Sequence, residues 1–86
     1  MREWRFQITD PCGLHARPAS ALTMTARKFQ SELRGDSNKH SADLKNIIEI
    51  LGLGAEFGDD VLIRAEGPDE AEAIEALKEA FEKERG

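Results

Sequence analysis

Two segments of the chain alternate between apolar and polar residues, which predicts strands with one buried face. The first covers residues 2–8 and is broken by Asp10-Pro11-Cys12-Gly13, because proline and glycine both interrupt regular structure. The second covers residues 61–66 and follows a glycine-rich turn. The apolar members of the two segments are Trp4, Phe6, Ile8, Val61, Ile63 and Ala65.

Two longer segments repeat apolar residues at spacings of three and four, which predicts amphipathic helices. The first runs from Ala16 to about Lys28, and Pro18 is tolerated in its first turn, where an N–H would have no partner. The second begins at Gly67-Pro68-Asp69-Glu70, where acidic residues suit the helix dipole. Their apolar faces comprise Ala19, Leu22, Ala26 and Phe29, and then Ala71, Ile74, Leu77 and Phe81.

The middle of the chain gives weaker signals. Residues 30–43 predict a hairpin, with short strands near 31–35 and 39–43 around a turn at Asp36-Ser37-Asn38. Residues 46–53 predict a short helix whose large apolar residues spread over more than half of its circumference. Such a helix is either buried nearly all round or exposed on one apolar flank. We favour the exposed flank, which would comprise Ile47, Ile48 and Leu51.

Composition narrows the class of protein. We expect the 86 residues of the chain, residues 1–86, to form a single domain with one thin core. A formal charge of -5 argues against nucleic acid as the main partner. The single cysteine, Cys12, cannot form an internal disulfide, which favours a reducing compartment. Because no segment has the length of a signal peptide core or a membrane span, we expect a cytoplasmic protein with no membrane insertion.

A nucleophilic side chain and anion-binding groups come together in one stretch, Gly13-Leu14-His15-Ala16-Arg17-Pro18-Ala19-Ser20. His15 immediately precedes the predicted helix, so the free backbone N–H groups of Ala16 and Arg17 and the helix dipole favour an anion there. The Arg17 guanidinium adds a fork that fits phosphate oxygens. A histidine in such positive surroundings favours its neutral, nucleophilic form and can hold a transferable group. The residues therefore predict a phosphoryl-accepting histidine.

The same stretch resembles the active-site signature of the histidine-containing phosphocarrier protein (HPr) family of the bacterial phosphoenolpyruvate-dependent sugar phosphotransferase system. The resemblance extends over nearly the whole chain. It includes Leu44-Lys45-Asn46-Ile47-Ile48 at a helix start, Leu53-Gly54 after that helix, and Gly67-Pro68-Asp69-Glu70-Ala71 at the last helix.

The resemblance implies an α+β open-faced β-sandwich, a four-stranded antiparallel sheet with three helices on one face in the order βαββαβα. It implies that enzyme I phosphorylates His15 on Nδ1, that Arg17 pairs with the phosphate, and that a IIA domain of a sugar permease or a regulatory equivalent accepts the group. The chain would be a carrier rather than an enzyme, without cofactor or metal. The docking surface for partners would comprise Ser20, Met24, Arg27, Asn46, Ile47, Ile48 and Leu51.

Two positions depart from the family pattern. Many members carry a serine that a kinase phosphorylates where this chain has Asn46, so control by a kinase at that position is excluded, although Asn46 can still cap the helix. Cys12 stands where members often have a small polar residue. We interpret it as a small, partly buried loop thiol in preference to a redox or metal-binding residue.

Three other functions remain open from the sequence. The chain could be a regulatory module that binds partners according to its phosphorylation state, without feeding sugar uptake. It could bind a metal through Cys12, His15 and His40, or it could be a scaffold that does not need His15. We expect a monomer, because two successive partners must reach one face of a small protein.

Overall fold

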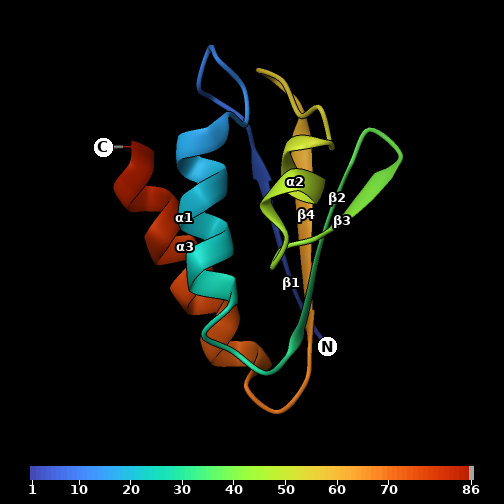
Figure 1. Cartoon of the computed structure of the whole chain (residues 1–86), viewed down its shortest axis with the longest axis vertical. Helices are drawn as coiled ribbons and strands as arrows, with labels where there is room; N and C mark the ends of the chain where they lie inside the picture. The colour runs from blue at the N-terminus through green and yellow to red at the C-terminus, as the bar shows by residue number, and fades with distance from the viewer. Residues whose placement is uncertain (86) are drawn as a thin grey trace.

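The computed structural model describes residues 1–85 and has seven elements (Figure 1). In chain order they are β1 (Arg2–Gln7), α1 (Ala16–Ala26), β2 (Glu32–Ser37), β3 (His40–Asp43), α2 (Ile47–Leu51), β4 (Asp60–Glu66) and α3 (Glu70–Arg85). None of the helices in residues 1–85 is long and apolar enough to cross a bilayer.

The four strands form one antiparallel sheet in the order β1-β4-β2-β3. β4 therefore lies in the middle, with Ile63 opposite Trp4 on one side and Gly35 on the other. Side chains on one face of the sheet are buried, whereas Arg34, Asp36 and Arg64 on the other face meet solvent. The helices cover the buried face, and α1 and α3 lie side by side (Figure 1). The predicted open-faced α+β sandwich is confirmed.

The core lies between the sheet and the helices. Its fully buried residues come from every layer, which fits the one-sided alternation of the strands and the stripes of the helices. Three aromatic rings, those of Trp4, Phe6 and Phe81, join β1 to the last turns of α3, with centroids 4.4 to 5.9 Å apart. The largest fully buried side chains are Leu22, Leu33, Leu44, Ile50, Val61, Ile63 and Leu77.

The hairpin turn lies later than the sequence predicts. Asp36 and Ser37 belong to β2, and the turn consists of Asn38 and Lys39, both with positive φ. Two consecutive residues of positive φ are typical of a tight hairpin turn whose twist matches that of the strands. β2 extends because Asp36 pairs with both neighbouring strands and the Ser37 hydroxyl donates to the carbonyl of Asp60 at 2.9 Å. The first helix is also shorter than predicted, since α1 ends at Ala26.

Asp69 joins the start of α3 to the segment between α1 and β2. One carboxylate oxygen accepts from the Ser31 hydroxyl and from the Ser31 N–H at 2.9 Å, and the other accepts from the Gln30 N–H at 2.9 Å. These hydrogen bonds, that of the Ser31 hydroxyl above all, hold the pKa of Asp69 below its usual value. The charged form of this side chain is therefore the form that supports the fold.

We expect Asp69→Asn to unfold at lower urea concentration than the wild type at neutral pH, because an amide cannot accept hydrogen bonds at both of its ends. A lowered pKa in the folded state gives stability that is present above the unfolded value of about 3.9 and lost as the pH falls through the folded value. The difference between the two proteins should therefore narrow in acid. Urea titrations across this range measure it, and a difference independent of pH would contradict the assignment.

Candidate functional site

A short loop between β1 and α1 places His15. Ile8 fixes its start, because its N–H donates to the carbonyl of Asp59 and its carbonyl accepts from Gly58, both at 2.8 Å. Leu14 fixes its end through a 2.9 Å hydrogen bond from its N–H to the carbonyl of Ala55. Between them Gly13 has φ +73, and a Cβ there would lie 2.7 Å from the Ala55 oxygen. Glycine is therefore required for the loop to approach its neighbour this closely.

His15 is the residue that precedes α1, as the sequence predicts. Its backbone is extended, and its side chain makes no capping hydrogen bond to the helix. Its carbonyl accepts from the Ala19 N–H at 3.2 Å, which opens the helical pattern. The first-turn N–H groups of Ala16 and Arg17 have no partner within the helix, and Pro18 has none to offer. The N-terminus of α1 beside His15 is thus a place that favours an anion.

A carboxylate that the sequence analysis missed lies against the imidazole. Oδ2 of Asp10 is 3.0 Å from Nε2 of His15, and Oδ1 of Asp10 accepts from the Cys12 N–H at 2.8 Å. The Cys12 N–H first, and the His15 ring second, hold the pKa of Asp10 below its usual value, so its carboxylate is charged at neutral pH. The histidine therefore stands between a positive helix end and a negative side chain, rather than in purely positive surroundings.

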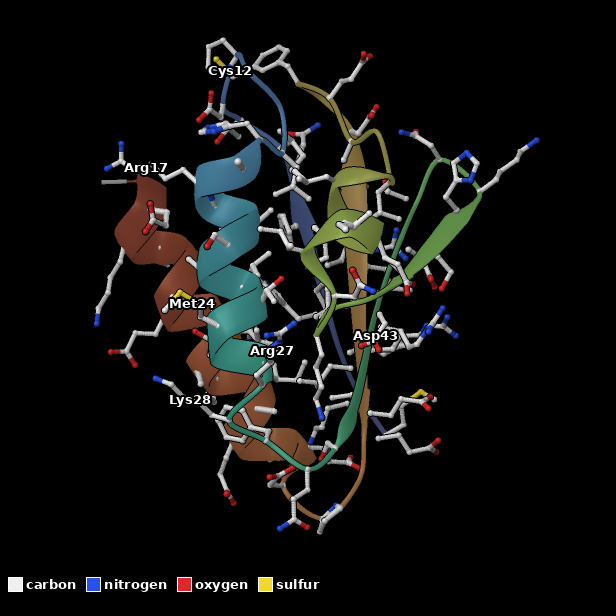
Figure 2. All side chains as sticks on the ribbon, viewed as in Figure 1. Cys12, Arg17, Met24, Arg27, Lys28 and Asp43 are labelled. Carbon is white, nitrogen blue, oxygen red and sulfur yellow. The ribbon has the colours of Figure 1, made fainter. Side chains whose placement is uncertain are left out.

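Arg17 lies on the exposed side of the helix start. Its Nε is 3.1 Å from Oε2 of Glu84 in the last turn of α3, and its side chain is 79% exposed. Figure 2 shows Arg17 at the same end of the molecule as Cys12. The guanidinium is thus near the helix N-terminus that it was predicted to serve, but it is paired with a carboxylate. No pattern in the sequence pointed to Glu84 as its partner.

The predicted docking residues lie along α1 and α2. Ile48 is 78% exposed and Leu51 is 41% exposed, so the expected apolar flank open to solvent is confirmed for these two of its three residues, and the alternative of a helix buried nearly all round is wrong. Ile47 is half-buried against the core. Asn46 caps α2, since its Oδ1 accepts from the N–H groups of Ile48 and Glu49. We call Ile47, Ile48 and Leu51 the α2 patch.

The α1 members of the predicted surface lie on the outer side of that helix. Met24 is 66% exposed, and the Ser20 hydroxyl lies 4.0 Å from its sulfur. Nε of Arg27 donates to the carbonyl of Lys45 at 2.9 Å, which ties the end of α1 to the start of α2. Met24 and Arg27 follow one another along α1, away from the end that holds Cys12 and Arg17 (Figure 2).

The structure also places Cys12, His40 and Phe57. Cys12 is exposed in the loop between β1 and α1, so its predicted partial burial is wrong. His40 lies at the start of β3 and is exposed. Within residues 1–85, no three histidine, cysteine or acidic side chains gather as a metal site, which removes the support for a site built from Cys12, His15 and His40. Phe57, which the sequence analysis did not single out, is 64% exposed in the loop after α2.

The chain resembles known proteins over almost its whole length. A family model described as the HPr component phosphorylation site of the PTS matches residues 3–83. The phosphocarrier protein HPr of Mycoplasma genitalium is 42% identical over 84 residues, 96% of each chain. The solved structure of a Mycoplasma histidine-containing phosphocarrier protein has a TM-score of 0.93 and 35% identity, covering 95% of this chain and 93% of that one. An HPr dimer from Thermoanaerobacter tengcongensis has a TM-score of 0.76 and 40% identity, covering 100% and 99%.

Proposed function

The chain belongs to the HPr family, the phosphocarriers of the phosphotransferase system, and from this premise we propose that it carries the phosphoryl group on Nδ1 of His15. The donor is a phosphoenolpyruvate-dependent enzyme I, and the acceptor is a IIA domain of a sugar permease. One observation supports this most directly. His15 stands at the open N-terminus of α1, where free N–H groups and the helix dipole stabilise the phosphoryl oxygens.

The charges around His15 suit a group that is held and then passed on. The N-terminus of α1 receives the negative phosphoryl oxygens. Arg17 lies two residues after His15, and its guanidinium reaches these oxygens once its ion pair with Glu84 is broken. The chain takes part in the transfer stoichiometrically and is regenerated by it, so it is a carrier and not an enzyme. The α2 patch and the exposed side of α1 receive the two partners in turn.

Incubation with enzyme I and radiolabelled phosphoenolpyruvate tests the proposal. We expect the protein to take up label that is stable in base and labile in acid, as a phosphoramidate bond is. A sample of a known carrier in the same reaction shows that enzyme I is active. If that control is labelled and this protein is not, the carrier proposal fails, and the alternative of a module that only docks on partners becomes the better one.

We expect Arg17→Ala to slow phosphoryl transfer roughly tenfold or more, because a guanidinium that stabilises the transferred group is lost. The free energy of unfolding should change by no more than about 1 kcal/mol, since the ion pair with Glu84 is exposed. Rapid-quench transfer rates and urea unfolding measure the two effects. Glu84→Gln is the matched control, because it removes the same ion pair and keeps the guanidinium. Equal slowing in both variants would contradict the role of Arg17.

We also propose that the carrier works as a monomer in the cytoplasm. Both partners must approach the end of the molecule that holds His15, and a single small domain leaves that end open to each of them. The structure of the relative from Thermoanaerobacter tengcongensis is that of a dimer, so the monomer proposed for this chain needs its own test. Sedimentation over a range of concentrations tests the monomer, and a mass that doubles without phosphorylation would refute it.

A further inference from the structure

We infer that Asp10 is a positioning residue for phosphoryl transfer, whose carboxylate holds the Nε2–H of His15 and so presents Nδ1 to the phosphoryl group. The inference deepens the proposed function and rests on it for the transfer itself. The contact between Asp10 and His15 exists independently of any partner.

Two contacts of the carboxylate and one of the Asp10 backbone hold this residue in the loop. Oδ1 of Asp10 accepts from the Cys12 N–H at 2.8 Å, and Oδ2 lies 3.0 Å from Nε2 of His15. The backbone carbonyl of Asp10 accepts from the Gly13 N–H at 2.9 Å, which closes a tight turn over the same residues. An exposed pair of long side chains gains little from such a contact. Here the short side chain of Asp10 is held by the backbone, so little side-chain freedom is lost when it meets the ring.

The chemistry of the two groups then determines which nitrogen of the His15 ring carries the proton. An ionised carboxylate has no hydrogen to give, so the hydrogen bond at Nε2 requires that nitrogen to carry the proton. In a neutral imidazole the other nitrogen, Nδ1, is then unprotonated and holds a free electron pair. In the part of the chain that the structure describes, Nδ1 of His15 has no hydrogen-bond partner. The nitrogen that must attack is therefore the one left open.

The carboxylate also matches the charge that develops during the step. The electron pair of Nδ1 forms the new bond to phosphorus, and the bond between phosphorus and the donor atom of enzyme I breaks, with its electron pair remaining on the donor. The proton stays on Nε2, so the ring becomes formally cationic and the adjacent carboxylate offsets that charge. When the group passes to the acceptor, the electron pair of the N–P bond returns to Nδ1.

Asp10→Asn gives the sharpest test, because it changes the hydrogen bonding at Nε2 without removing the side chain. The amide oxygen keeps the hydrogen bond from the Cys12 N–H, which turns the amide N–H group toward Nε2 of His15. A donor at that position favours the opposite tautomer, with the proton on Nδ1. We expect this variant to accept the phosphoryl group at least roughly tenfold more slowly than the wild type at saturating enzyme I, and more slowly than Asp10→Ala.

Two measurements test the expected effect of Asp10→Asn, one of the transfer rate and one of the His15 tautomer. Rapid-quench transfer separates the rate at saturation from the KM for enzyme I, and we expect only the rate to change. Correlations between ring protons and ring nitrogens by NMR report the tautomer without any partner, and we expect Nε2–H in the wild type and Nδ1–H in Asp10→Asn. Asp59→Asn is the matched control, because Asp59 also accepts a backbone N–H beside this loop but does not touch His15. It should behave like the wild type in both measurements.

A purely structural role for Asp10 predicts the opposite order, with Asp10→Asn close to the wild type and Asp10→Ala slower. That order, or a wild-type tautomer in Asp10→Asn, would overturn the inference. If the wild type itself accepts no phosphoryl group from an active enzyme I, the proposed function fails, and the tautomer measurement still decides whether Asp10 orients the ring.

Discussion

His15→Ala is expected to take up no label at all from enzyme I and phosphoenolpyruvate, while its urea unfolding stays close to that of the wild type. The side chain supplies the only atom that forms the proposed covalent bond, and without it the helix end can hold a free anion but cannot carry a group. The imidazole is 37% exposed, so its removal should leave the packing of the core intact. Acid-labile counts on the purified variant measure the effect.

The other histidine provides the control. His40 is exposed at the start of β3, on the hairpin rather than at the N-terminus of α1. His40→Ala should accept label at the wild-type rate. Label that survives in His15→Ala and disappears in His40→Ala would show that the site has been assigned to the wrong residue.

Ile48→Glu is expected to raise the KM for partners by about tenfold to a hundredfold, with little change in the rate at saturation. A side chain that is 78% exposed adds little to the fold, so the variant should remain folded. At an apolar interface the new carboxylate would be buried without a partner, which costs far more than the lost contact. Initial transfer rates over a range of enzyme I concentrations separate the KM from the rate.

A change of charge alone could also affect association, so it needs its own control. Ser41→Glu adds the same charge at an exposed position of β3, outside the α2 patch. Its KM should stay near the wild-type value. Equal increases in KM for Ser41→Glu and Ile48→Glu would mean that net charge, rather than the α2 patch, governs docking.

Most of the fold was predictable where local rules decide it. β1 and β4 follow from alternation over six or seven residues, and the start of α1 follows from Pro18, which fits only the first turn. The position of the hairpin turn was not predictable in this way. Asp36-Ser37-Asn38 looks like a turn in isolation, but pairing with β4 draws Asp36 and Ser37 into the strand. Long-range strand pairing overrides local turn preference there.

The same distinction between local and long-range effects applies to the residues of the site. His15 and the helix N-terminus lie within one short segment, so their juxtaposition follows from the order of residues. The contact of Asp10 with the His15 ring depends on how a loop that contains proline and glycine folds back. An acidic residue five positions before a candidate nucleophile is nevertheless a sequence signal that could have pointed to it. Glu84 lies 67 residues from Arg17 in the chain, and only the packing of α3 on α1 brings the two together. The exposure of Cys12 likewise depends on where the loop tip points.

The ion pair between Arg17 and Glu84 has a consequence for the balance between the loaded and the empty carrier. If Arg17 pairs with the phosphoryl group as proposed, Glu84 loses its counter-ion, and that loss offsets part of the gain from binding the phosphoryl group. For an exposed pair the offset is about 1 kcal/mol at most. A phosphoryl carrier works best when the phosphoryl group is nearly as stable on the acceptor protein as on the carrier itself. Under the proposed function, the competing Glu84 carboxylate would shift the equilibrium toward release of the phosphoryl group, although Glu84 lies 67 residues from Arg17 in the chain.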